Sequence, residues 1–428
     1  MKIAIIGAGF TGLSSAYTLT KLGHEVKIFE KDPGPGGLAI GYKEKNWSWS
    51  LEKHYHHWFT NDRSVLDLAK EINFDVVIKR PKTSVYVNEN IYQLDSPTSV
   101  LKFPLLSIFD RLRMSLVVGF FKYDPFWKYL EKYKASDILP KIMGKKPYEM
   151  IWQPLFVNKF GEFANNVSLA WFWARIKKRT PSLVYPKGGF LTFANQLVKE
   201  IEKNKGLVYF ETEIIELNQE DKVNIKFIDI KGNVKTENFD KAIVTVPSFL
   251  FLKITKGLPD DYKNSLGKLK GLGATNLVLR LNKPFFKDST YWLSVCDKNA
   301  PVMAIVEHTN FMDKKNYDNE HILYLGNYKK PTDPYFLMTK DEMLNKFDSY
   351  LNKINPDYKK NIIGFELFKA PFAQPIIPIN YSKILPSFET PFKNIFLANI
   401  EQVYPWDRGT NYAVELGQKV VYEMLKNV

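Results

Sequence analysis

Hydrophobic and polar positions at the start of the chain follow the pattern of a strand, a helix and a second strand. Residues 2–6 form a short apolar run, typical of a buried strand. Over residues 11–22 the apolar side chains recur at helical spacing, and Gly23 suits the position just past a helix end. Residues 25–30 then alternate as a second strand. This order predicts the opening of a parallel α/β sheet.

The rest of the chain is expected to be mixed. Residues 75–185 are rich in helix signals and bulky aromatic residues. The pattern predicts further helices at about 64–72, 193–203, 340–353 and 411–426. It predicts further strands at 207–217, 223–230, 241–246, 274–281, 302–307, 321–328 and 394–398.

One helical stripe of apolar side chains has two interpretations. Its members are Ile108, Phe109, Leu112, Leu116, Phe120 and Phe121. Such a stripe is expected to face the core, and contact with a membrane surface is the alternative.

Composition sets the class of protein. A chain of 428 residues with 45% hydrophobic and 25% charged residues is long enough for two or three domains with large cores. This composition excludes general disorder. The single cysteine, Cys296, excludes a disulfide framework and a thiolate zinc cluster.

The net charge of +14 comes almost entirely from lysine, because the chain has only eight arginines. The lysines are spread along the sequence without a basic tail or an arginine-rich helix. We therefore expect a solvated surface and no nucleic-acid partner, while attraction to anionic lipid or to an anionic substrate stays open. The apolar run at residues 3–6 is too short for a signal segment, and no window is long enough to span a bilayer. The expected location is the cytoplasm, with peripheral contact at the inner membrane face left open.

A glycine-rich motif carries the first chemistry. It lies between the first strand and helix and reads Gly7-Ala8-Gly9-Phe10-Thr11-Gly12. In this context Gly7 permits a tight turn, Gly9 leaves room for a pyrophosphate, and Gly12 allows close packing of helix and strand. Glu30, at the end of the second strand, is placed to accept hydrogen bonds from a ribose and would repel a 2′-phosphate. The motif predicts a dinucleotide site; a glycine turn needed only for packing is the alternative.

Two further segments establish a resemblance. After Glu30 and Lys31 the chain carries a second glycine pair, Gly36-Gly37-Leu38. Near the end it carries Asn399 and then Asp407-Arg408-Gly409-Thr410-Asn411-Tyr412. Together these segments resemble flavoproteins of the amine oxidase / phytoene desaturase / protoporphyrinogen oxidase superfamily. A prokaryotic protoporphyrinogen-oxidase-like subgroup is closer still, because its members have segments similar to 54–59, 152–155, 159–161 and 407–411 of this chain. The chain departs from the usual closing motif at Asn399, where Gly-Asp or Gly-Glu is common.

The resemblance implies an α/β fold: a Rossmann-like FAD-binding domain with a second, mixed α+β substrate domain. The FAD-binding domain would be assembled from residues 1–75, 185–255 and 386–428, and the substrate domain from 76–184 and 256–385. The cofactor would be FAD. The residues expected to contact it are Gly7, Ala8, Gly9, Phe10, Thr11, Gly12, Glu30, Lys31, Gly36, Gly37, Leu38, Ile214, Val246, Asn399, Gly409, Thr410, Asn411 and Tyr412.

Three of the six histidines lie together at His54, His56 and His57. They suit proton transfer beside the flavin, packing in an aromatic cluster, or a metal site. No carboxylate–histidine motif accompanies them, so no metal is expected. Arg408 suits an anionic substrate, the flavin's own negative charge, or an ion pair with Asp407. We take His56, His57 and Arg408 as candidate catalytic residues.

Lys159 is expected to be structural, and Trp406 is the best aromatic candidate for the pocket.

The resemblance predicts an enzyme that transfers hydride from a carbon of a small-molecule substrate to flavin N5. The substrate would be apolar, or amine-, isoprenoid- or porphyrinogen-like. One alternative is a non-redox flavoenzyme that acts on a nucleotide sugar, as UDP-galactopyranose mutase does. Another is a flavin-free escort protein, which the intact glycine motif and Glu30 argue against.

Overall fold

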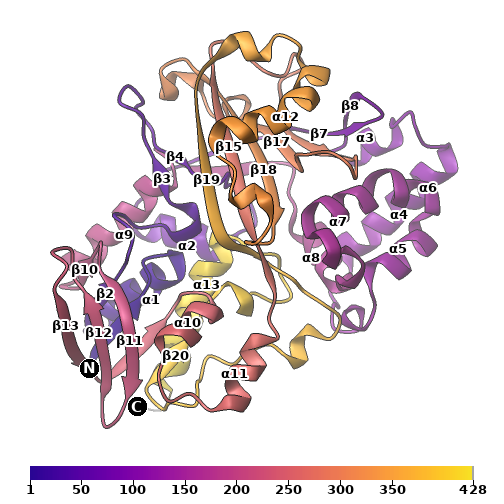
Figure 1. Cartoon of the computed structure of the whole chain (residues 1–428). Coiled ribbons are helices and arrows are strands. Elements are labelled where there is room, and N and C mark those ends of the chain that lie inside the picture. Colours follow the sequence, from indigo (N-terminus) through magenta and orange to yellow (C-terminus); the bar gives the residue numbers. More distant parts are fainter. Residues whose placement is uncertain (427–428) are drawn as a thin grey trace.

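The computed structural model describes residues 1–426. It opens with β1 (Lys2–Ile6), α1 (Phe10–Lys21) and β2 (Glu25–Phe29), so the predicted strand–helix–strand order is confirmed. β1 and β2 belong to a five-stranded parallel sheet in the order β10-β2-β1-β14-β20. The other strands are β10 (Leu207–Tyr209), β14 (Lys241–Val244) and β20 (Ile395–Leu397). Segments from the beginning, middle and end of the chain thus form one sheet, and the predicted α/β fold class is confirmed (Figure 1).

Alternation along β1 determines how this sheet is covered. Ile3 and Ile5 belong to the core shared with α1, α9 (Phe190–Lys203) and α13 (Thr410–Leu425). Ala4 and Ile6 point to the opposite face and pack toward an antiparallel sheet of three strands. That sheet consists of β11 (Glu213–Gln219), β12 (Val223–Ile228) and β13 (Val234–Phe239). Successive side chains of a strand point to opposite faces, so one short apolar run is buried on both sides.

A second large sheet has seven strands in the order β19-β15-β18-β17-β16-β7-β8. Its strands are β7 (Lys82–Val87), β8 (Asn90–Gln93), β15 (Gly271–Leu281), β16 (Thr290–Val295), β17 (Ala304–Glu307), β18 (His321–Lys329) and β19 (Ile362–Pro375). Helix α12 (Lys340–Ile354) packs on it through Met343, Phe347 and Leu351.

Shorter elements link the two large sheets. A third sheet joins β5 (Trp58–Phe59), β9 (Leu183–Pro186) and β6 (Val76–Lys79), and β3 (Gly41–Tyr42) pairs with β4 (Leu51–Glu52). The remaining helices here are α2 (Arg63–Glu71), α10 (Ser248–Ile254) and α11 (Asp260–Gly267).

A helical layer lies beside the seven-stranded sheet, at the right of Figure 1. It contains α3 (Pro97–Leu101), α4 (Ile108–Tyr123), α5 (Ala135–Met143), α6 (Lys145–Pro147), α7 (Gln153–Phe160) and α8 (Leu169–Lys178). The helices expected in this part of the chain are present, although β6, β7 and β8 precede them. Within residues 1–426 we find no helix with the length and apolar character needed to cross a membrane.

The expectation that the 108–121 stripe faces the core is wrong for most of its members. Phe109 is 81% exposed and Leu116 is 75% exposed, whereas Met114 and Phe121 are each 1% exposed and point into the core. Helix α4 therefore has two apolar faces, and the core covers only one of them. Periodicity identified the helix but not the face that meets the core.

Candidate active site

The two glycine motifs lie against each other at the carboxyl ends of β1 and β2. The Gly36 N–H donates to the Ala8 carbonyl at 2.9 Å. A Cβ atom on Gly37 would lie 3.1 Å from the Gly9 Cα, and one on Gly12 would lie 2.0 Å from the Gly7 carbonyl oxygen. Only glycine, which lacks a Cβ atom, allows the two backbones to approach so closely. The backbone N–H groups of these loops lie at the edge of the sheet where dinucleotides bind.

Glu30 is fixed beside the glycine loop. Its side-chain oxygens accept hydrogen bonds from the Ala8 N–H at 2.7 Å and the Asp32 N–H at 2.9 Å. The residue is 8% exposed, and this burial raises the pKa of its carboxyl group above the usual value. A carboxyl group held at the end of β2 is suited to the ribose of a dinucleotide.

Helices α1 and α13 both begin at glycines without a side-chain cap, Gly9 and Gly409. The first N–H groups of a helix lack intrahelical partners and carry partial positive charge. The N-terminus of α1 suits a pyrophosphate, and that of α13 suits the negative charge of a reduced flavin. With the glycine contacts and Glu30, these ends make the site fit FAD.

Several of the residues expected to contact FAD have side chains engaged elsewhere. Phe10 and Ile214 are buried in the core. The amide of Asn399 donates to the Val246 carbonyl at 3.2 Å and to the Ser248 hydroxyl at 3.1 Å.

In the closing motif, the Thr410 hydroxyl accepts a hydrogen bond from the Trp58 indole, and Asn411 accepts one from the Val65 N–H. The backbone, rather than these side chains, is available to a cofactor at these positions. Lys31 is exposed and Leu38 is half-buried.

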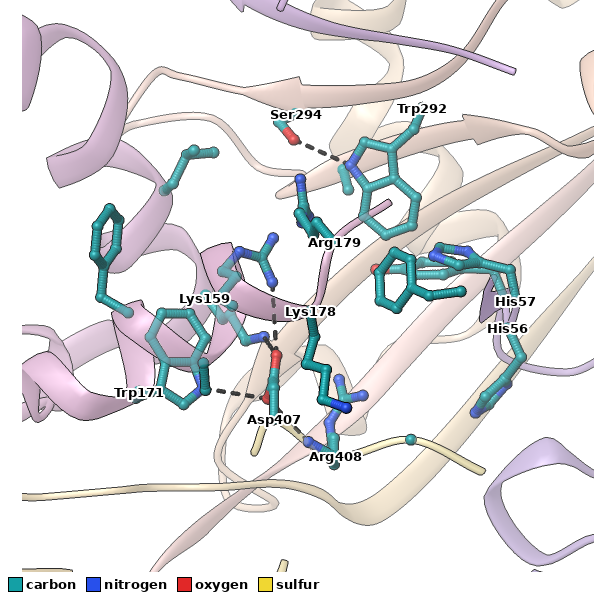
Figure 2. Close-up of a pocket in the computed structure, with 18 of the residues that line it drawn as sticks. His56, His57, Lys159, Trp171, Lys178, Arg179, Trp292, Ser294, Asp407 and Arg408 are labelled. Atoms are coloured by element: carbon teal, nitrogen blue, oxygen red, sulfur yellow. Dashed lines mark hydrogen bonds and ion pairs between the residues drawn. The ribbon is translucent and has the colours of Figure 1, made fainter. Parts of the chain in front are cut away.

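The three candidate catalytic residues line one pocket. His56, His57 and Arg408 surround a cavity of about 180 Å³ that also reaches Gly409 and Asn411 at the start of α13. Figure 2 places the two histidines on one side and Lys159, Asp407 and Arg408 on the other. The aromatic lining residues are Tyr55, Phe59, Trp152, Phe156, Trp171, Phe172, Trp292, Tyr328 and Tyr412. Trp406, the expected pocket aromatic, instead stacks on Trp173 with ring centroids 5.2 Å apart.

The pocket histidines are neutral at pH 7. The Nδ1 of His56 lies 2.6 Å from the His54 carbonyl oxygen, and that of His57 lies 3.3 Å from the Tyr291 hydroxyl. Burial lowers the pKa of His56 to about 4 and that of His57 to about 3. Each neutral imidazole has a lone pair that can accept a proton, but burial makes both rings weak bases. No group of His, Cys, Asp and Glu side chains in residues 1–426 is arranged to hold a metal ion.

Asp407 is the centre of a charged cluster. Its carboxylate lies 3.1 Å from the Lys159 ammonium and 3.6 Å from the Arg175 guanidinium, and it accepts a hydrogen bond from Trp171 at 3.2 Å. Burial alone would raise the pKa of Asp407, but attraction to Lys159, Arg408 and Arg175 outweighs burial and lowers the pKa far below its usual value. Asp407 is therefore ionised. Lys159, expected to be structural, is 8% exposed and belongs to the pocket.

Of the alternatives for Arg408, the side-chain ion pair with Asp407 is not formed. Its guanidinium donates to the Tyr328 hydroxyl and lies 4.8 Å from the centre of that ring. Its buried Nε has no hydrogen-bond partner among the described residues.

Sequence reasoning also missed Arg175, Lys178 and Arg179, which line the same pocket. The available signal was their spacing on one helix end in a chain with only eight arginines.

A parallel sheet with paired glycine loops, a buried strand-end carboxyl group and an uncapped helix beside a pocket define a dinucleotide-binding flavoprotein fold. The model of the family described as flavin containing amine oxidoreductase matches residues 10–405. The chain belongs to this family. FAD is therefore its cofactor.

Individual relatives are distant. An L-amino-acid oxidase from Daboia russelii is 23% identical over 311 residues, which cover 67% of this chain and 60% of that oxidase. An oxidoreductase from Methanosarcina mazei has a TM-score of 0.76 at 19% identity, covering 99% of this chain and 100% of that chain. A reduced UDP-galactopyranose mutase has a TM-score of 0.75 at 16% identity, covering 100% and 96%. The chain spans less than two thirds of the oxidase, and the structural similarities establish the fold alone.

Proposed function

We propose that the chain oxidises a carbon of a small-molecule substrate bound in the pocket of His56, His57 and Arg408. The observation that carries this proposal is the opening of that pocket onto the uncapped start of α13. Bound FAD supplies the hydride acceptor. The FAD-binding part would comprise residues 1–75, 185–255 and 386–428, and the substrate part 76–184 and 256–385.

The chain's own residues have separate roles in this proposal. The glycine loop and Glu30 bind the dinucleotide end of the cofactor. His57 or His56, each neutral, accepts the proton that leaves the substrate with the hydride. The aromatic walls orient an apolar substrate body and exclude water.

The absorption spectrum of the purified protein is the first test of this proposal. We expect two flavin bands and FAD as the chromophore released on denaturation. An anaerobic screen of candidate donors, read by bleaching of the flavin band, then identifies the substrate class. His57→Ala should slow bleaching by at least about tenfold, because general-base catalysis contributes 10²–10⁴-fold. A colourless protein that takes up no added FAD, or no bleaching by any donor class, would contradict the proposal.

The cationic pocket favours a second candidate, chemistry on a nucleotide sugar. Arg175, Arg179 and Arg408 all line the pocket and would suit a diphosphate. The fold shared with UDP-galactopyranose mutase is compatible with this chemistry. Isomerisation of a UDP-sugar only after prior reduction of the flavin would support this candidate, and absence of UDP-sugar binding would remove it.

We also propose that the outer face of α4 contacts an anionic membrane surface. Phe109, Leu112, Leu116 and Phe120 form one stripe and are 81%, 47%, 75% and 56% exposed. Exposed apolar patches of this kind mark interaction surfaces. Exposed lysines on neighbouring segments, Lys102, Lys128 and Lys132, add attraction to anionic lipid.

A further inference from the structure

The pocket wall holds more positive than negative charge. Five of its residues have basic side chains: Lys159, Arg175, Lys178, Arg179 and Arg408. Only two carboxyl groups line it, Asp62 and Asp407. Burial raises the pKa of Asp62 to about 6. Below that pH the carboxyl group is mostly protonated, so it offsets less of the positive charge of the pocket. Three of the eight arginines in the chain converge here.

Asp407 neutralises only part of this charge. It pairs with Lys159 at 3.1 Å and with Arg175 at 3.6 Å. Arg179, one helical turn beyond Arg175, forms no ion pair with any described residue. Repulsion from Arg175 is the main cause that lowers the pKa of Arg179. Two like charges at this spacing repel each other, and an anion bound between them would relieve the repulsion.

The excess cations are not explained by the cofactor loops. Lys159 belongs to α7, while Arg175 and Lys178 belong to α8, which Arg179 directly follows. Both helices lie in the helical layer, which contains neither glycine motif. Arg175 and Arg179 also contribute to the low pKa of His57, so their charges act on the side of the pocket where a proton would be accepted.

We propose that the substrate carries a carboxylate or phosphate group, which Arg175 and Arg179 bind at the pocket wall. This inference rests on the proposed function of the pocket as the substrate site. The two guanidinium groups supply the fork of N–H donors that recognises oxyanions. Trp152, Trp171 and Trp292 line the same cavity and accept the apolar body of the substrate. An alkylammonium group meets repulsion from these two arginines, so the substrate is an amphiphilic acid rather than a simple amine.

The test uses the FAD-loaded protein and four ligands with the same chain: octanoate, octyl phosphate, octanamide and octylamine. Calorimetry measures the affinity of each, and the difference spectrum of the flavin shows whether the ligand lies beside it. We expect both acids, or one of them, to bind at least tenfold more tightly than octanamide and octylamine. Preference for octanoate or for octyl phosphate distinguishes a carboxylate from a phosphate substrate.

Variants assign the effect to the arginines. Arg179 is exposed, so Arg179→Ala should fold normally; we expect at least a tenfold loss of acid affinity and no loss for octanamide. Arg179→Lys should recover part of that loss. Arg80→Ala, at an exposed arginine outside the pocket, should bind like the wild type.

Each contrary result has its own meaning. Equal binding of all four ligands, or equal affinities of Arg179→Ala and Arg80→Ala, would overturn the inference. The acids could also bind selectively and depend on Arg179 while the flavin spectrum stays unchanged. That result would support the anion site but contradict the proposed function, because the ligand would not lie beside the flavin.

Discussion

At the scale of single residues, Asp407 is the most consequential charge in the pocket. Asp407→Asn keeps an oxygen for Trp171 but removes the negative charge beside Lys159 and Arg175. We expect a loss of about 2–4 kcal/mol in the free energy of unfolding, because breaking a largely buried ion pair leaves a cation uncompensated. Urea unfolding in a buffer free of carboxylate and phosphate measures this loss.

A surface ion pair provides the control for Asp407. Asp75 lies 3.1 Å from Lys187, and both side chains are mostly exposed. Asp75→Asn should change the unfolding free energy by less than about 1 kcal/mol. If the two substitutions changed the free energy of unfolding equally, the charge of Asp407 would contribute no more to stability than a surface charge does.

A second residue, Glu52, makes stability depend on pH. Its carboxyl oxygens accept hydrogen bonds from the Tyr185 hydroxyl at 2.7 Å and the Phe190 N–H at 2.8 Å. Burial raises its pKa from 4.5 to about 7. The folded state therefore binds this proton more tightly than the unfolded state, and stability falls as pH rises from about 4.5 to about 7.

Glu52→Gln should remove this contribution. The stability of the wild type relative to the variant should fall by up to about 1.4 kcal/mol per pH unit within that window and stay constant above it. Denaturant unfolding at a series of pH values measures the difference, and parallel curves would contradict the role of Glu52. Histidines of low pKa act in the opposite direction in both proteins, so they cancel in the comparison.

At the scale of elements, the outward face of α4 carries a prediction about partners. Phe109→Ser with Leu116→Ser should weaken binding to vesicles of phosphatidylcholine and phosphatidylglycerol by at least about tenfold, because two large apolar side chains no longer enter the lipid. Cosedimentation measures the bound fraction. Leu337→Ser changes a side chain that is 84% exposed elsewhere and should leave binding intact. Equal binding by the wild type and the α4 variant would exclude this face as the contact.

The elements also show what periodicity can predict. β1, α1 and β2 were predictable because their pattern and their glycine loop lie within one short stretch. β19 was missed because its 14 residues mix buried and exposed positions without regular alternation. The chain was expected to form one strand at 207–217, but it forms β10 and β11 with a turn between them. Pairing partners, which sequence patterns do not reveal, decide such cases.

At the scale of the whole molecule, the cofactor loops could be predicted from the sequence, whereas the cationic wall of the pocket could not. The cofactor loops are compact in sequence, and Gly9 and Gly36 form a parallel bridge in the structure. The cationic wall combines the neighbouring helices α7 and α8 with the closing motif, which lies far along the chain. Lys159 and Arg408 could be proposed individually, but their shared surroundings follow only from the fold.

The whole fold also joins the two ends of the chain, which makes its stability depend on FAD. The Ser14 hydroxyl donates to the Val414 carbonyl at 3.0 Å, and a Cβ on Gly417 would lie 2.4 Å from the Thr11 carbonyl oxygen. Helices α1 and α13 are thus in direct contact, and each presents its uncapped start to the cofactor site. A ligand bound at both starts favours the assembled sheet over the unfolded chain.

We therefore expect added FAD to stabilise the flavin-stripped protein by about 2.7 kcal/mol at a hundredfold excess over its Kd. Gly12→Ala should abolish this gain, since its Cβ would lie 2.0 Å from the Gly7 carbonyl oxygen and displace the loop. Gly267→Ala, where a Cβ meets no atom within 4 Å, should retain the gain. Thermal unfolding with and without FAD measures all three proteins. An equal FAD-dependent shift in Gly12→Ala would separate the glycine loop from cofactor binding, because the loop would then be a packing feature of α1 alone.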